Sequence, residues 1–271
     1  MTVSLQFIGT ATTLIRYGGI VLLTDPNFLH KGERAYVGKG LTAKRLTEPA
    51  LPITDLPPLD GVVLSHLHGD HWDRVARRGL DRDLPILTTP HASKRLQLQR
   101  FPRALGLRTW SSHVIAKADR FVRVTALPGR HAPGIVQRLL PPVMGSLLEF
   151  GRHPDEVELT MYISGDTLMF DGVHEIASRY RGIDVGVVHL GGTVILRSMV
   201  VTMDGVQGAD WVEVVNPKRV VPVHYDDYDR FKSPLWDFTA EVARRGLQGK
   251  LVELKRGGTA TFARGQEPVV E

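Results

Sequence analysis

Residues 65–73 gather three imidazoles and two carboxylates that could bind metal ions. Neutral imidazole and carboxylate are the ligands that zinc and similar ions prefer in proteins. His66 and His68 are two residues apart in an extended stretch, so both rings can face one point. Asp70 and His71 follow where the chain turns, within reach of a second point. The spacing therefore predicts two adjacent metal sites, each still short of ligands. The alternative is that these histidines only cap a helix.

The elements around this segment are predicted to hold it at the end of a buried strand. Residues 61–64 are short, apolar and β-branched, which indicates a strand covered on both faces. A helix is expected to begin near Trp72, because Val75, Ala76 and Leu80 recur at helical spacing. The histidines thus lie where a strand gives way to a helix.

Other predicted strands end in residues of the same chemical kind. Residues 121–127 alternate apolar and polar side chains and lead to His131, residues 158–164 lead to Asp166, and residues 219–223 deliver His224. If these strand ends meet, they complete an inventory for two metals, made up of His66, His68, Asp70, His71, His131, Asp166 and His224.

These motifs, in this order and over nearly the whole chain, resemble those of the metallo-β-lactamase fold superfamily. The resemblance implies a four-layer αββα sandwich of the mixed α/β (α+β) class, with two mixed sheets flanked by helices. It also implies that His66, His68 and His131 hold one metal and that Asp70, His71 and His224 hold the other. Asp166 would then bridge the two ions.

The opening residues 7–12 and 20–28 resemble one branch of the superfamily, which contains ascorbate-6-phosphate lactonase and N-acylphosphatidylethanolamine phospholipase D. In that branch a turn of G-H-A-T type and a later D-P turn follow the first strands. This chain keeps Asp25-Pro26 but carries Thr10 where the branch commonly has histidine.

The last third of the chain predicts helices alternating with strands. Thr202 is expected to cap a helix that ends at Asn216-Pro217, and Ser233-Pro234 to open another that ends at Gly246. Residues 251–262 are expected to form an antiparallel hairpin around a glycine pair. Since the ligands run from His66 to His224, residues 1–271 are expected to form a single domain.

Composition limits the classes of protein that fit. A hydrophobic content of 42% supports a full core at this length. No apolar run reaches the roughly 18 residues of a membrane span, and the first residues lack a signal-peptide pattern, so the expected location is cytoplasmic. The chain has no cysteine, which excludes disulfides and thiolate ligands. The net charge of +5 favours anionic substrates only mildly.

Three further residues could support the site. Asp25 could orient a ligand imidazole or simply form a turn. His189 follows a buried strand and could lie near the pocket or be an ordinary core histidine. Tyr225 could direct its hydroxyl at a developing charge or only pack beside His224.

Residues 132–145 follow His131 directly and are apolar without strand alternation, and their prolines prevent one long helix. They could form a lid or pocket wall for an apolar part of the substrate, to which Ile135, Leu139, Leu140, Val143 and Met144 would contribute. They could equally pack on the body of the protein or at a dimer contact in a homo-oligomer.

The inventory predicts a binuclear metal-dependent hydrolase acting on a phosphodiester or on a lactone or ester. Two divalent ions, zinc first and otherwise manganese, iron or nickel, would activate a water, and Asp70 could accept a proton. A small-molecule substrate is expected and a nucleic acid is not. The alternatives are a nuclease of the same fold, a metal-bound sensor or scaffold without turnover, and an iron redox protein, for which the usual flavin domain is lacking.

Overall fold

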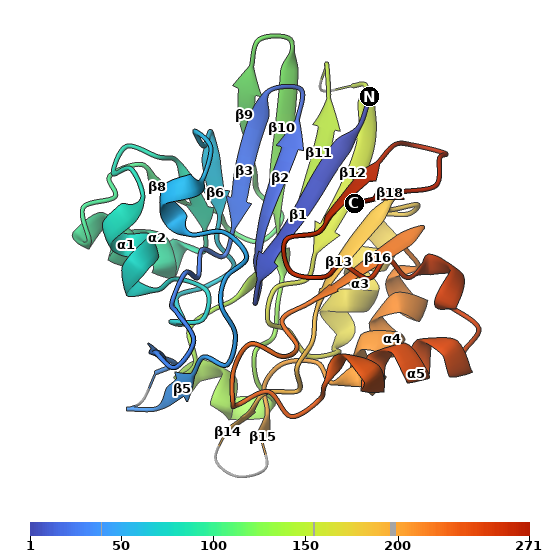
Figure 1. The fold of residues 1–271 in the computed structure, drawn as a ribbon. Helices are drawn as coiled ribbons and strands as arrows, with labels where there is room; N and C mark the ends of the chain where they lie inside the picture. Colours follow the sequence, from blue (N-terminus) through green and yellow to red (C-terminus); the bar gives the residue numbers. More distant parts are fainter. Residues whose placement is uncertain (39, 154, 196–198) are drawn as a thin grey trace.

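Two β-sheets form the centre of the molecule (Figure 1). The computed structural model describes residues 1–38, 40–153, 155–195 and 199–271. In these residues the first sheet has the order β18-β17-β1-β2-β3-β6-β7-β8. Its strands are β1 Val3–Gly9, β2 Thr12–Tyr17, β3 Ile20–Thr24, β6 Gly61–Val63, β7 Ile86–Thr88, β8 Ala104–Gly106, β17 Thr259–Phe262 and β18 Val269–Val270.

The second sheet has the order β16-β13-β12-β11-β10-β9. Its strands are β9 Ser112–Lys117, β10 Arg120–Pro128, β11 Met144–Gly151, β12 Val157–Ile163, β13 Val185–His189 and β16 Arg219–Val223. Short hairpins pair β4 Arg34–Tyr36 with β5 Thr42–Lys44, and β14 Val194–Ile195 with β15 Met199–Val200. Both sheets mix parallel and antiparallel pairs, as expected.

Helices cover the outer face of each sheet (Figure 1). On the first sheet these are α1 Arg74–Gly79 and α2 Pro90–Leu98, and on the second they are α3 Asp171–Arg179, α4 Gly205–Val215 and α5 Leu235–Arg244. Short 3₁₀ segments are η1 Ile53–Asp55, η2 Gly134–Leu139 and η3 Gln248–Lys250. The expected αββα layering is confirmed.

Strand alternation assigns side chains to separate cores. In β12, Leu159, Met161 and Ile163 pack between the two sheets, whereas Tyr162 faces the helices behind the second sheet. In β6, Val63 lies between the sheets and Val62 faces α1 and α2. Because successive side chains of a strand point to opposite faces, a strand with apolar residues on both faces must be buried, as β6 is.

The strand directions bring several carboxyl ends to one edge. Strands β10 and β12 both pair antiparallel with β11, so they run in the same direction. Strands β13 and β16 continue the sheet in parallel with β12. The carboxyl ends of these strands therefore lie at one edge of the second sheet, and the residues that follow them meet there.

Two local predictions in the last third of the chain are wrong. Helix α4 is capped by Asp204, whose side chain accepts the Gln207 N–H at 2.9 Å, and Thr202 is instead buried ahead of the helix. Residues 251–262 do not form a hairpin, because the chain passes from one sheet to the other. Leu251 bridges Val220 of the second sheet, and only β17 pairs with β1 of the first.

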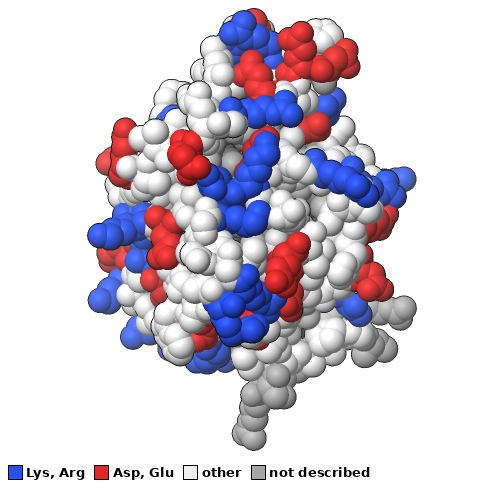
Figure 2. Space-filling view, turned by 90° about the vertical axis from the view of Figure 1, so that its right-hand side faces the viewer, with Lys and Arg blue, Asp and Glu red and all other residues white. Residues whose placement is uncertain are grey.

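No helix among the described residues is long and apolar enough to cross a membrane. On the face shown in Figure 2, basic and acidic side chains are interspersed rather than separated by sign. Charged side chains also pair between helices: Arg245, on the segment after α5, contacts both Asp210 and Glu213 of α4 at 2.7 Å.

The helix after the histidine segment begins later than expected, at Arg74, because Asp73 is its N-cap. The Asp73 carboxylate accepts the Ala76 N–H at 2.7 Å, which satisfies a free donor of the first turn. Its other oxygen accepts the N–H groups of Phe28 and Leu29 and so ties α1 to the loop after β3.

We expect Asp73→Ala to lower the free energy of unfolding by about 2–4 kcal/mol, because it removes the cap and leaves buried N–H donors without a partner. Denaturant unfolding of the wild type and the variant measures the change. Asp83→Ala, at an exposed position in the following loop, is the control and should cost less than about 0.5 kcal/mol. Equal stabilities of the two variants would contradict this role for Asp73.

Candidate metal centre

All the candidate ligands lie together where strands of the two sheets end. The loop after β6 provides His66, His68, Asp70 and His71, while His131, Asp166 and His224 follow β10, β12 and β16. Each of these side chains is at most 8% exposed. Residues from distant parts of the sequence are thus brought into one buried site.

Three histidines form a first cluster. The Nδ1 atom of His68 lies 3.0 Å from Nε2 of His66 and 3.1 Å from Nε2 of His131. Two nitrogens bound to one tetrahedral zinc are about 3.3 Å apart when each metal–nitrogen bond is about 2.0–2.1 Å. The spacing of these nitrogens therefore fits a shared metal ion.

A second cluster adjoins the first and combines Asp70, His71, Asp166 and His224, whose ligand atoms all lie within 4.8 Å of one another. His71 Nε2 is 3.2 Å from Asp166 Oδ2, and His224 Nε2 is 3.6 Å from both Asp70 Oδ2 and Asp166 Oδ1. The rings of His66 and His71 are only 4.2 Å apart between centroids. The two clusters are therefore neighbours, as the spacing of the histidine segment suggests.

Several atoms of these clusters are buried without a hydrogen bond. Among the described residues, no partner is found for Nε2 of His71 and His224 or for Oδ1 of Asp70 and Asp166. Buried polar atoms are nearly always paired, and an unpaired one costs about 1–3 kcal/mol. The two carboxylate oxygens are electron-pair donors. Burial alone would lower the pKa of His71 and of His224, but Asp166 and its neighbouring carboxylates raise it, so a bound cation would take the place of a proton on each Nε2. The donor set fits divalent metal ions.

Hydrogen bonds on the far side of the rings fix which nitrogen faces the clusters. Nδ1 of His131 donates to the Val201 carbonyl at 2.8 Å, and Nδ1 of His224 donates to the Leu190 carbonyl at 3.0 Å. A ring that donates through Nδ1 keeps a lone pair on Nε2, the form that binds a metal. The backbone therefore selects the ligand atoms of both rings.

Asp25 does the same for His71, whose Nδ1 lies 2.8 Å from Asp25 Oδ2. The carboxylate also accepts the Ser65 N–H at 2.6 Å and the Ser65 hydroxyl at 2.8 Å. Burial alone would raise the pKa of Asp25, but His71 and His189 lower it to about 2. The ionised carboxylate thus contacts His71 directly, in the place that the first of its two interpretations requires.

Of the other two supporting candidates, His189 lies outside these two clusters but forms a third group of possible ligands with Asp25 and His71, whose ligand atoms lie within 4.8 Å of one another. His189 is buried, with Nε2 3.6 Å from Asp25 Oδ2 and Nδ1 3.3 Å from the Ser164 hydroxyl. It therefore contacts the residue that orients His71. Tyr225 is partly buried, lies 6.1 Å from Phe7 between ring centroids and packs against the cores on both faces of the second sheet.

Burial and charge set the protonation of the clusters. Burial, together with the nearby His131, lowers the pKa of His68 to about 3, and burial also lowers the pKa of His66 and of His131. These rings are therefore neutral near pH 7, as metal binding requires. Burial would raise the pKa of Asp70, but His71 and His224 lower it, so that this carboxylate is ionised.

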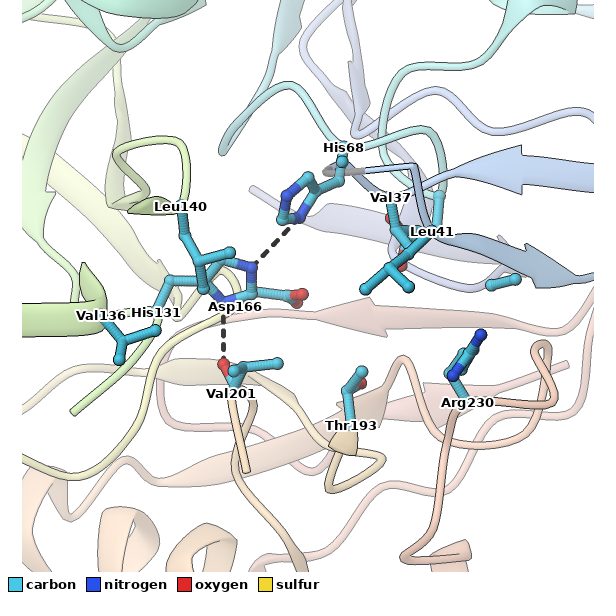
Figure 3. A pocket seen from close by; sticks show the side chains of 13 residues that line it. Val37, Leu41, His68, His131, Val136, Leu140, Asp166, Thr193, Val201 and Arg230 are labelled. Atoms are coloured by element: carbon cyan, nitrogen blue, oxygen red, sulfur yellow. Dashed lines mark hydrogen bonds between the residues drawn. The ribbon is translucent and has the colours of Figure 1, made fainter. Parts of the chain in front are cut away.

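A cavity of about 240 Å³ opens onto both clusters (Figure 3). Val136 and Leu140, from the segment after His131, form part of its wall. Val143 and Met144 instead pack into the core, and the side chains of Ile135 and Leu139 lie outside the described part of the chain. The complete lining is Val37, Gly38, Leu41, Ala43, His68, Asp70, His131, Val136, Leu140, Asp166, Thr193, Val201 and Arg230.

Sequence reasoning missed residues that reach the site only through tertiary contacts. The Thr202 hydroxyl, assigned from sequence to a helix cap, donates to Asp166 Oδ2 at 3.3 Å. The presence of Asp204, a better cap placed immediately before Gly205, could have indicated that Thr202 was free for another role. Leu41, Thr193 and Arg230 carry no local pattern that marks them as cavity residues.

Two proteins of known sequence resemble this chain. A metal-dependent hydrolase (UPF0173) of Thermodesulfovibrio yellowstonii is 24% identical over 251 residues, which cover 89% of this chain and 85% of the relative. A mitochondrial N-acyl-phosphatidylethanolamine-hydrolyzing phospholipase D of Saccharomyces cerevisiae is 27% identical over 130 residues, or 47% of this chain and 27% of the relative.

Among solved structures, an isothiocyanate hydrolase from Delia radicum gut bacteria has the same fold, with a TM-score of 0.80. The two chains are 22% identical, and the match covers 96% of this chain and 99% of the other. Residues 22–225, more than half of the chain, match the sequence model of a protein family whose description is beta-lactamase superfamily domain. With a three-histidine cluster beside a mixed cluster of histidines and aspartates, this chain belongs to the beta-lactamase superfamily, as a metal-dependent hydrolase of the metallo-β-lactamase fold.

Proposed function

We propose that this hydrolase uses a binuclear metal site to cleave a small lactone or ester, or a phosphodiester. The observation that carries the proposal is the pair of adjacent clusters with unpaired ligand atoms, placed at the end of a largely apolar cavity. When bound, two divalent cations would activate water for attack and polarise the substrate oxygen. We expect zinc first, with manganese, iron and nickel as alternatives.

Each residue of the clusters has a distinct part in this proposal. His66, His68 and His131 would hold one ion, and Asp70, His71 and His224 the other, with Asp166 between them. Thr202 would hold one oxygen of Asp166, which leaves the other oxygen free for a metal. Asp70, which lies in the cavity wall, would accept the proton of the attacking water.

The cavity favours a compact substrate with an apolar portion. Its volume is about 240 Å³, against roughly 150 Å³ for a cavity that holds benzene. An isothiocyanate, for which the similar hydrolase of known structure is named, is a second candidate, because it is small and apolar and has an electrophilic carbon. A cavity of this volume supports a small molecule over a nucleic acid.

The proposal includes one domain over residues 1–271, because the ligands come from both sheets. A cytoplasmic location remains a prediction from the sequence alone.

The first test is metal content together with turnover. We expect two metal ions per chain after saturation, and Asp166→Ala should lower both occupancy and kcat/KM, the latter by about 100-fold or more, since it would remove the ligand between the ions. Elemental analysis and a panel of lactones, carboxylic esters, phosphodiesters, isothiocyanates and structured RNA give the two readouts.

The matched control is Asp171→Ala, an exposed aspartate five residues along the same segment, which should keep both metals and full activity. A single metal after saturation would contradict the binuclear site. Salt-sensitive cleavage of the RNA, with the small substrates untouched, would make the protein a nuclease.

A second test concerns the support of His71 by Asp25. We expect Asp25→Asn to weaken the second metal by about 10- to 100-fold while the first stays bound, because the ring of His71 loses the charged acceptor that orients it. Competition with a chromogenic chelator would resolve the two affinities. Asp55→Asn, at an exposed position, is the control, and equal loss of both metals in Asp25→Asn would argue against a role specific to His71.

A third test concerns the cavity wall after His131. The double variant Val136→Ser and Leu140→Ser should raise KM for an apolar substrate by about tenfold or more, since each change removes apolar contact in the pocket. Metal content should stay the same because the ligands come from other residues. Leu98→Ser, at a position 86% exposed on α2, is the control. A changed oligomeric state with KM intact would instead favour the dimer contact.

A further inference from the structure

The cavity contains two polar side chains that the clusters do not use. Among the described residues that line it, only Thr193 and Arg230 are polar and lie outside the clusters. The rest of the wall is apolar and includes Val37, Leu41 and Leu140. Figure 3 shows Thr193 and Arg230 on the same wall, below His68 and across from Leu140.

The hydroxyl of Thr193 is buried and has no hydrogen-bond partner among the described residues. The backbone fixes its position, because the Thr193 carbonyl accepts the Val201 N–H at 2.9 Å. A buried hydroxyl normally has a partner in the protein or in a bound molecule. Since this one lines the cavity, its partner is expected to be a molecule that enters the cavity.

Among the described residues, Arg230 forms no ion pair with a carboxylate. Its Nε and Nη2 both lie 3.3 Å from the Thr42 carbonyl, and Nη1 has no described partner. The neighbouring carboxylate of Asp229 is engaged elsewhere, since it accepts the Lys44 N–H at 2.9 Å. The guanidinium is thus held in place while its charge is not neutralised.

Backbone hydrogen bonds tie the two segments together. The Gly191 carbonyl accepts the N–H groups of Lys232 at 2.7 Å and of Ser233 at 2.9 Å. Thr193 and Arg230 each lie two residues from one end of this contact, which holds their main chains close together, and the Thr42 carbonyl holds the guanidinium of Arg230. A pair of donors fixed in this way is preorganised for a ligand.

We infer that Arg230 and Thr193 bind an oxyanion of the substrate, such as a carboxylate, that is separate from the bond cleaved at the metal clusters. The inference rests on the proposed function and narrows its substrate class. A guanidinium presents several donors to a carboxylate, and the threonine hydroxyl adds one more. The substrate is then a small ester or lactone with an apolar body and one anionic group.

This arrangement ranks the proposed substrates. A phosphodiester carries its charge on the group that reacts, so that charge would lie at the clusters and leave Arg230 without a partner. A neutral isothiocyanate would leave both Arg230 and Thr193 unused, and the apolar wall alone would recognise it. An anionic ester uses every polar group of the wall.

The test measures binding to the metal-loaded protein, so it does not depend on turnover. The probes are 3-phenylpropionate and its neutral amide, 3-phenylpropionamide, compared by titration calorimetry. We expect the carboxylate to bind about 10- to 100-fold more tightly than the amide, as for a hydrogen bond to a charged group in a sheltered site. Arg230→Leu should abolish this preference, Thr193→Val should reduce it, and Arg230→Lys should keep part of it.

Arg34→Leu is the matched control. Arg34 lies on strand β4, which pairs with the strand that carries Thr42. Its side chain is exposed and contacts the Thr42 hydroxyl at 3.2 Å, but it does not line the cavity. It should leave the preference as in the wild type. Circular dichroism of each variant verifies folding.

A carboxylate preference that survives Arg230→Leu would mean that the metals hold the anion, which overturns the inference. No preference in the wild type, or no binding of either probe at millimolar concentration, would overturn it as well. Failure of the proposed function appears separately, as missing turnover or a single metal ion, and leaves this binding comparison intact.

Discussion

The carboxylate of Asp25 joins the parts of the protein on which the candidate metal centre depends. Asp25 follows β3 of the first sheet and has a φ angle of 35°, in the left-handed region. Its carboxylate accepts hydrogen bonds from the backbone N–H and the hydroxyl of Ser65. It also contacts His71 and lies 3.6 Å from His189 at the end of a strand of the second sheet. Since a buried carboxylate is costly unless it is paired, these contacts restrain one another and hold the histidine segment against both sheets.

A second buried network supports His224 from the other side. His224 has φ of 63°, an unfavourable conformation for a residue with a side chain. Its N–H donates to the Thr10 carbonyl at 2.7 Å, and the Thr10 N–H donates to Asp227 Oδ2 at 2.7 Å. Arg45, which is fully buried, lies 3.7 Å from Asp227. Thr10 therefore supports His224 through its backbone, and this contact does not depend on the side chain at position 10.

Prediction from sequence succeeded where the signal is local and periodic. The alternation in residues 158–164 indicates β12, since a period of two assigns each side chain to a face. The cluster around His66 indicates metal binding because so dense a set of imidazoles and carboxylates has few other uses. Prediction from sequence failed where two local structures are both compatible with the same residues. Thr202 and Asp204 can both cap a helix, and only the packing of Thr202 against Asp166 decides between them. The apparent hairpin in residues 251–262 failed because its halves join different sheets.

The sequence by itself determined the fold class, the strands that end in candidate ligands and the chemical type of the site, because these follow from residue type and spacing. The tertiary structure decided which atom of each ring faces the clusters, since Nδ1 of His131 and of His224 is fixed by carbonyls 70 and 34 residues away. It also decided the cavity wall, which Arg230 and Thr193 line together because backbone contacts join the distant segments that carry them. Such contacts depend on how the sheets pack, and no pattern of neighbouring residues encodes them.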